Sequence, residues 1–252
     1  DHVRCWYNEQ GYNFYALDLR KHGRYLLPHQ RACYARDLGE YFPEITAAIR
    51  LIRSEDGNRQ LLLQGHSTGG LTTVLYADRG AEKAQIDALV LNSPFFAFKA
   101  STIEKRLMNW YAGWSSWRPG LALPVEFEGF YGRSLHRSHQ GEWDYTQAWK
   151  PIEGHPLHAA WIRAINRAHR ALYRGLSVSI PTLVMRSDKS GTVRSMSELV
   201  FESDIVLDVK DMETYSQRIG KQVEVLTINN AIHDIFLSKA AVREQAFAAL
   251  GD

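Results

Sequence analysis

Residues 60–70 read QLLLQGHSTGG, and this stretch decides the fold class. Gln60–Gln64 is a short continuous apolar run, typical of a strand buried on both faces, and Thr68–Asp78 has apolar residues at helical spacing. Between them, Gly65–Gly69 is a G-x-S-x-G motif, which places a serine on a sharp strand-to-helix turn. The stretch predicts a strand–turn–helix unit with Ser67 as candidate nucleophile. The alternative is a glycine-rich turn whose serine only caps the helix.

Similar strand and helix patterns alternate along the rest of the chain. Alternation at this spacing implies crossover connections and a mostly parallel sheet flanked by helices, which is an α/β fold. The predicted strands are Asn13–Leu19, Gln60–Gln64, Ala88–Asn92, Pro181–Met185 and Val223–Ile228, and the predicted helices are Asp37–Arg53, Thr68–Asp78, Asp211–Ile219 and Phe236–Leu250.

The alternation breaks between Phe98 and Ile180, where the sequence is aromatic and helical in character. We expect a core formed by residues 1–98 and 176–252, interrupted by a helical cap insertion at 99–175. Six of the seven tryptophans lie in the insertion, and Trp110, Trp114 and Trp117 share one helix face. This face is either the core of the cap or an apolar wall above Ser67. Trp114 is therefore a candidate substrate-binding residue.

Composition limits the function classes. A net charge of +2 is too small to favour nucleic acid or a membrane surface, and no apolar run is long enough to span a bilayer. Two cysteines without a CxxC motif favour reduced thiols, which makes the cytoplasm the default compartment. The pairs His136/His139 and His155/His158 have HxxH spacing but no obvious third ligand, so we expect surface histidines rather than a metal site. No cofactor is expected.

A general base and an acid are needed to activate Ser67. In a fold with this order of elements the histidine follows the last strand, and His233 comes soon after Val223–Ile228. The acid must be a buried carboxylate that fixes the imidazole tautomer. Asp188, directly after Pro181–Met185, and Asp204 are both candidates. The Thr68 N–H, at the start of a helix, is a candidate oxyanion donor.

The chain resembles the monoacylglycerol lipase and lysophospholipase-like group of α/β-hydrolases, also described as serine aminopeptidase-like. The resemblance is carried by Tyr15–Arg20 with Gly23-Arg24, Gly65–Gly70, Asn92-Ser93-Pro94, and His233-Asp234 before Leu237-Ser238. In that group the acid lies about thirty residues before the histidine and precedes a short hydrophobic stretch. Asp204 is 29 residues before His233, whereas Asp188 is 45 before it, so the resemblance favours Asp204.

The same resemblance implies a function, and it also shows where this chain differs from the family. It implies hydrolysis of a small-molecule or lipid-like carboxylic ester; the alternatives are a thioesterase or aminopeptidase of the same fold, or a non-catalytic binding protein that keeps it. The family carries a His-Gly pair at the end of an earlier strand, whose loop supplies the second oxyanion donor. No such pair precedes Tyr12. We therefore expect the first strands of the family's sheet to be missing. The sequence does not indicate an oligomeric state.

Overall fold

The computed structural model describes residues 1–114, 117–118, 120–123 and 128–251. Within these residues the sheet contains four parallel strands in the order β1-β2-β3-β4. The strands are β1 (Leu62–His66), β2 (Ala88–Asn92), β3 (Thr182–Ser187) and β4 (Val223–Ile228). The α-helices are α1 (His2–Glu9), α2 (Phe42–Arg50), α3 (Thr68–Arg79), α4 (Thr102–Trp114), α5 (Phe130–Leu135), α6 (Ala159–Arg174), α7 (Val209–Ser216) and α8 (Ala240–Gly251).

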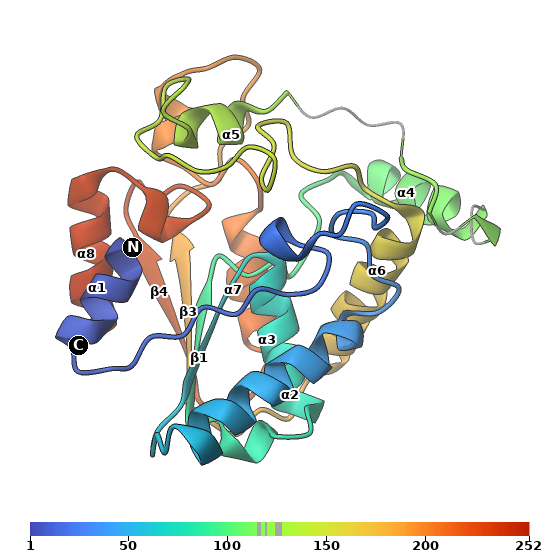
Figure 1. The fold of residues 1–252 in the computed structure, drawn as a ribbon. Coiled ribbons are helices and arrows are strands. Elements are labelled where there is room, and N and C mark those ends of the chain that lie inside the picture. Colours follow the sequence, from blue (N-terminus) through green and yellow to red (C-terminus); the bar gives the residue numbers. More distant parts are fainter. Residues whose placement is uncertain (115–116, 119, 124–127, 252) are drawn as a thin grey trace.

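The strands follow one another across the sheet in chain order, so each connection crosses from one strand to its neighbour. Right-handed crossovers that progress in one direction place their helices on a single face. Accordingly α3, α6 and α7 contribute to one hydrophobic core together with α2. The second core lies on the opposite face, where α8 packs on the sheet and α1 packs beside it (Figure 1).

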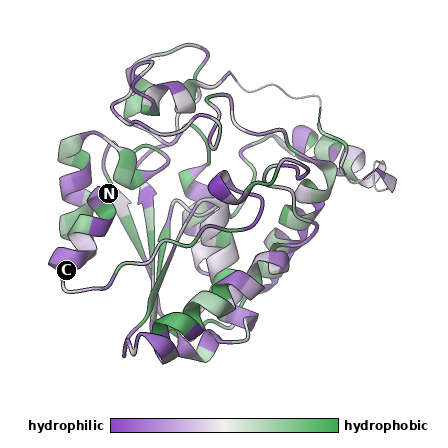
Figure 2. Ribbon diagram, viewed as in Figure 1, coloured by the Kyte–Doolittle hydropathy of each residue, from purple (hydrophilic) through white to green (hydrophobic). Residues whose placement is uncertain are grey.

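Apolar residues in the strands explain why the sheet is central. In β2 and β3 the side chains are largely buried on both faces, as a parallel sheet covered by helices requires. Figure 2 shows hydrophobic residues along much of the sheet and polar residues on the outer surfaces of the helices. Because all four strands are parallel, their carboxyl ends meet at one edge of the sheet, where loops can bring functional side chains together.

The predicted elements agree with the structure at most positions. Ala88–Asn92 and Val223–Ile228 have the predicted bounds. β3 begins one residue later and ends two residues later than the strand predicted at Pro181–Met185, and β1 is shifted by two residues from the strand predicted at Gln60–Gln64. The helix predicted at Asp37–Arg53 consists of a 3₁₀ turn at Leu38–Tyr41, α2, and a π-helical turn at Leu51–Glu55.

The strand predicted at Asn13–Leu19 is wrong. This segment is extended, but it belongs to no strand, and Tyr15 and Leu17 are more than 40% exposed. Among the backbone hydrogen bonds of the described residues, none involves Asn13–Asp18. An apolar segment becomes a strand only when an adjacent edge supplies its hydrogen bonds, and no backbone hydrogen bond of the described residues joins Asn13–Asp18 to the free edge of β1.

Candidate active site

Ser67 occupies a tight turn between β1 and α3. Its φ of 53° and ψ of −119° lie in a region that non-glycine residues rarely adopt. Such a residue costs about 1–3 kcal/mol and persists only where its surroundings hold it. The Ser67 N–H donates to the carbonyl of Asn92 at the end of β2, at 3.1 Å, and the Ser67 carbonyl accepts from Phe95 N–H at 3.0 Å. The strained serine is thus fixed by the neighbouring strand.

Two glycines around Ser67 are required by close packing. A Cβ on Gly65 would lie 2.5 Å from Thr73 Oγ1 and 2.6 Å from the carbonyl oxygen of Gly69. A Cβ on Gly70 would lie 2.9 Å from Pro94 Cβ. Gly69 itself has open space where its Cβ would be. The first glycine of the G-x-S-x-G motif is therefore a steric necessity here, but the second is not.

His233 and Asp204 form a hydrogen-bonded row with Ser67. His233 follows β4, and its Nε2 lies 3.0 Å from Ser67 Oγ. Its Nδ1 lies 2.9 Å from Asp204 Oδ2. His233 and Asp204 are buried, with 3% and 0% of their surfaces exposed. The structure therefore brings together the three residues that the sequence selected.

Asp204 is held as an anion in this buried position. Its Oδ1 accepts the Val206 N–H at 2.8 Å and the Leu207 N–H at 2.7 Å. Burial raises the pKa of Asp204, but the charge and hydrogen bond of His233 and the two backbone hydrogen bonds outweigh burial, and the net pKa is lowered. A charged Asp204 can hold the Nδ1–H tautomer of His233, which leaves Nε2 free to accept a proton from Ser67.

Lys99 organises the loop that carries Asp204, and no sequence pattern indicates this role. Ser190, which follows β3, forms an isolated β-bridge with Asp204, and this bridge holds the loop beside the end of the strand. The Lys99 ammonium donates to the carbonyl oxygens of Gly191, Asp204 and Ile205, so it joins both sides of the loop. Partial burial lowers the pKa of Lys99.

Asp188 stabilises a different turn. Its Oδ1 accepts the backbone N–H of Asn230 at 2.7 Å, and its own N–H donates to the Ile228 carbonyl at 3.2 Å. Asn230 has a φ of 57°, and the carboxylate of Asp188 supports this left-handed position. Asp188 therefore connects the ends of β3 and β4, and Asp204 is the carboxylate that contacts His233.

A second carboxylate, that of Asp234, lies partly buried beside the row and was missed as a functional residue. Its Oδ1 accepts from Asn92 Nδ2 at 2.8 Å. Burial raises the pKa of Asp234, but the neighbouring His66, the Asn92 hydrogen bond and Lys150 outweigh burial and lower it overall. His66 donates from Nδ1 to the Asn92 carbonyl, and burial lowers the pKa of His66 to about 4. His66 is a packed neighbour of His233, with ring centroids 4.8 Å apart.

Tyr131 connects the segment between β2 and β3 to the candidate site. It lies in α5, its ring contacts His233 edge-on with centroids 5.6 Å apart, and its hydroxyl accepts the Asp234 N–H at 3.1 Å. Burial raises the pKa of Tyr131 well above its usual range, so the hydroxyl stays protonated. Nothing in the local sequence pattern identifies this residue, because the contact depends on how the whole segment folds.

The two other predicted site residues differ in placement. Thr68 is the first residue of α3, and backbone N–H groups at this position have no acceptor within their helix. Trp114 ends α4 with 56% of its surface exposed, stacked on Trp110. Trp114 is not among the residues that line the cavity next to His66 and Gly69. The geometry therefore gives no support to Trp114 as a wall above Ser67.

Two of the four histidines with HxxH spacing differ from the expectation of surface positions, whereas His139 is exposed as expected. His136 and His158 are buried, with 6% and 8% exposed. His136 bonds Ser138 Oγ and the Tyr145 carbonyl, and His158 donates to the Gly120 carbonyl. These hydrogen bonds give each of the two buried rings a polar partner. In the described part of the chain no group of three or more His, Cys, Asp or Glu residues could hold a metal ion.

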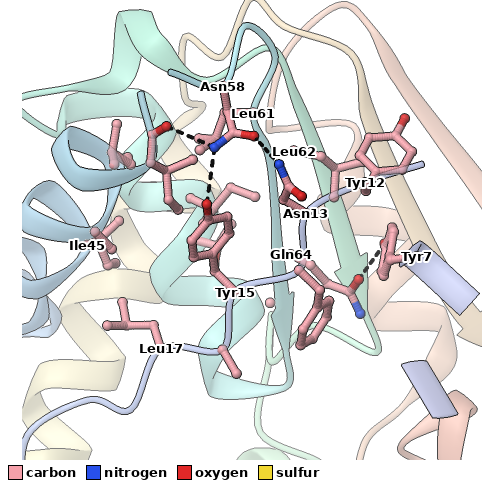
Figure 3. A pocket seen from close by; sticks show the side chains of 18 of the residues that line it. Tyr7, Tyr12, Asn13, Tyr15, Leu17, Ile45, Asn58, Leu61, Leu62 and Gln64 are labelled. Atoms are coloured by element: carbon pink, nitrogen blue, oxygen red, sulfur yellow. Dashed lines mark hydrogen bonds between the residues drawn. The ribbon is translucent and has the colours of Figure 1, made fainter. Parts of the chain in front are cut away.

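A cavity of about 970 Å³ lies beside the edge of β1 that is not paired with β2. It extends from His66 and Gly69, in the turn that carries Ser67 (the elbow), to the extended segment at Asn13–Leu19. Figure 3 shows polar contacts across and beside it, among them Tyr7 with Gln64. The cavity separates the predicted first strand from β1, which explains why that strand does not form.

A parallel sheet with a strained serine after β1 and a histidine after β4 defines the α/β-hydrolase fold, with its partners in the order Ser, Asp, His. The family model described as serine aminopeptidase, S33, matches residues 1–239, and the chain belongs to this family. The resemblance seen in the sequence is thereby confirmed. No curated protein matches the chain.

Solved structures share the fold. The monoacylglycerol lipase of Paleococcus ferrophilus is 18% identical, with a TM-score of 0.69, over 99% of this chain and 86% of that one. A soluble variant of monoglyceride lipase from Saccharomyces cerevisiae is 16% identical, with a TM-score of 0.65, over 93% and 74%. An esterase from Exiguobacterium antarcticum is 15% identical, with a TM-score of 0.58, over 99% and 85%.

Proposed function

We propose that this protein is a serine hydrolase that cleaves a small-molecule or lipid-like carboxylic ester through an acyl-enzyme. Ser67 would be the nucleophile, His233 the general base and acid, and Asp204 the residue that orients His233. The observation that carries the proposal is the hydrogen-bonded row from Ser67 Oγ through His233 to a fully buried Asp204.

The geometry supports a two-step reaction. His233 Nε2 removes the Ser67 proton as Oγ attacks the ester carbonyl, and the resulting imidazolium is stabilised by Asp204. The Thr68 N–H would donate to the oxyanion of the tetrahedral intermediate. His233 then protonates the leaving alcohol, and a water molecule, activated by the same imidazole, hydrolyses the acyl-enzyme. None of these steps requires a cofactor.

The segment between β2 and β3 would cover the site. We retain the division into a core at 1–98 and 176–252 and a cap at 99–175. Tyr131, in α5 of this segment, reaches His233. The last helix of the segment, α6, also contributes Ile165 and Leu172 to the main hydrophobic core, so the cap is anchored by a core helix.

A fluorophosphonate probe tests the nucleophile directly. We expect a covalent adduct on Ser67 in the full chain and none in Ser67→Ala. Turnover of p-nitrophenyl esters of increasing acyl length should accompany the adduct. Labelling without turnover of esters, thioesters or anilides would instead support a binding protein that retains a reactive serine. A higher kcat/KM for thioesters or anilides would reassign the substrate class.

A further inference from the structure

A groove of about 290 Å³ lies at the junction of α4, α6 and α7. Figure 1 shows α4 beside α6 at the periphery of the molecule. Like every other helix of the described residues, α4 is not long and apolar enough to cross a membrane. Asn109 of α4 accepts a hydrogen bond from Asn166 of α6 at 2.6 Å, and both asparagines line the groove. Ser67, His233 and Asp204 do not line it, so the groove is separate from the candidate active site.

The two charged side chains that line the groove are both basic. Lys105 of α4 is half-buried, and Arg170 of α6 is exposed. In the part of the chain that the structure describes, neither side chain forms a hydrogen bond or an ion pair. Asp211 of α7 lies close enough for Lys105 to lower its pKa, although burial raises that pKa overall, and Asp211 does not line the groove. Two cations without a partner at one groove favour an anionic ligand, to which they can donate charge-assisted hydrogen bonds.

One wall of the groove is a row of stacked rings. Tyr215 stacks on Tyr173 with ring centroids 4.1 Å apart, and Tyr173 stacks on His169 with centroids 5.8 Å apart and 16° between the ring planes. Nε2 of the buried His169 donates to the Phe95 carbonyl at 2.8 Å, which holds the imidazole in place. A fixed wall of aromatic rings suits a ligand with a planar ring of its own.

We propose that the groove between α4, α6 and α7 binds a small aromatic carboxylate. The carboxylate would accept hydrogen bonds from Lys105 and from Arg170, whose guanidinium fork matches carboxylate geometry. The ring would lie against Tyr173 and Tyr215. A volume of about 290 Å³ is at the lower end of the range for ligand pockets, so the groove would hold one ring rather than a lipid chain. An inorganic anion would leave the aromatic wall uncovered, and a neutral aromatic molecule would leave both cations without a partner.

Isothermal titration calorimetry with benzoate tests the proposal on the full chain. No ester is present, so the result does not depend on the reactivity of Ser67. We expect a Kd of about 1 mM or lower, which is within the reach of so small a ligand. Benzamide keeps the ring without the charge, and acetate keeps the charge without the ring. Each should bind about tenfold more weakly than benzoate, or weaker still.

Variants of the groove locate the binding site. Lys105→Gln and Arg170→Gln should each weaken benzoate binding by about tenfold, because each removes a charged donor. Asp211→Asn should strengthen binding, because it removes the carboxylate that competes for Lys105.

Arg106→Gln and Arg174→Gln are the matched controls. These exposed arginines lie in α4 and α6 but do not line the groove, so each variant loses the same charge at a neighbouring position and should bind benzoate as the parent does. Circular dichroism should show that every variant is folded. Three results would overturn the proposal: no binding of benzoate, equal affinity for benzoate and either of its two analogues, or the same loss of affinity in the control variants as in Lys105→Gln and Arg170→Gln.

Discussion

Asn92 Nδ2 donates to Asp234 Oδ1 at 2.8 Å, across 142 residues of sequence. The same asparagine accepts the Ile235 N–H on its side-chain oxygen and the Ser67 N–H on its carbonyl. One residue at the end of β2 thus holds both the turn that carries the nucleophile and the loop that carries the histidine. The distance between Ser67 and His233 is set by this asparagine as well as by the strands.

Asn92→Leu should therefore reduce both stability and reactivity. It leaves the buried Ile235 N–H without its acceptor and Asp234 Oδ1 with only the Phe236 N–H. A buried polar group without a partner costs about 1–3 kcal/mol. Urea unfolding should show a loss in this range or above, and probe labelling of Ser67 should be slower. Asn13→Ala, which removes an exposed asparagine pair with Asn58, is the control and should leave both nearly unchanged. Equal effects of the two variants would contradict the assigned role.

Asp204→Asn should lower kcat by about 10⁴-fold while the protein remains folded, because the wrong imidazole tautomer is then favoured. Asp188→Asn should affect mainly stability, since Asp188 supports the turn at Asn230. Steady-state kinetics on the best p-nitrophenyl ester separates the two. A larger loss of kcat in Asp188→Asn than in Asp204→Asn would reverse the assignment.

The glycines of the elbow should respond unequally to alanine. Gly65→Ala forces a Cβ to 2.5 Å from Thr73 Oγ1, so we expect destabilisation of about 1–3 kcal/mol and loss of labelling. Gly69→Ala meets no atom within 4 Å and lies inside α3, where alanine is favoured over glycine by about 1 kcal/mol. Thermal unfolding should show an unchanged or higher Tm for Gly69→Ala. A Tm drop comparable to that of Gly65→Ala would contradict the structure.

Acid should destabilise the fold partly through His169 in α6. Burial lowers the pKa of His169 to about 4, although its hydrogen bond to the Phe95 carbonyl raises it. In the unfolded chain the pKa is about 6.5, so between pH 6.5 and 4 the unfolded state binds a proton that the folded state does not. The contribution of neutral His169 to stability is complete above pH 6.5 and is lost as pH falls toward 4.

The size of this effect is about 1.4 kcal/mol per pH unit for one histidine. His169→Gln keeps a donor for Phe95 but cannot titrate, so the free energy of unfolding should fall less steeply with acid over this range. His29→Gln, at an exposed loop position, is the control and should leave the slope of the parent unchanged. Parallel slopes in parent and His169→Gln would show that His169 does not remain neutral.

Features that depend on local pattern could be predicted from the amino-acid sequence. A continuous apolar run gave β2 its bounds, because a strand buried on both faces must be apolar. The bounds of β4 were predicted as well, although Glu224 and Thr227 in this strand are exposed. The glycines and serine of the elbow selected Ser67, because few residues tolerate that backbone geometry. The 29-residue spacing between Asp204 and His233 favoured Asp204 as the acid, because the family has a similar spacing. The position of His233 after the last strand favoured it as the base.

Only the tertiary structure decided what depends on contacts between distant segments. Asn13–Leu19 has a strand's composition, yet it forms no ladder, because pairing needs an adjacent edge and a cavity separates this segment from β1. Lys99, Tyr131 and Asp234 reach the site through long-range packing that no local pattern encodes. Helical spacing showed that Trp110, Trp114 and Trp117 share a face. The direction of that face was set by packing of the opposite side of α4 on α6, which turns the tryptophans toward solvent.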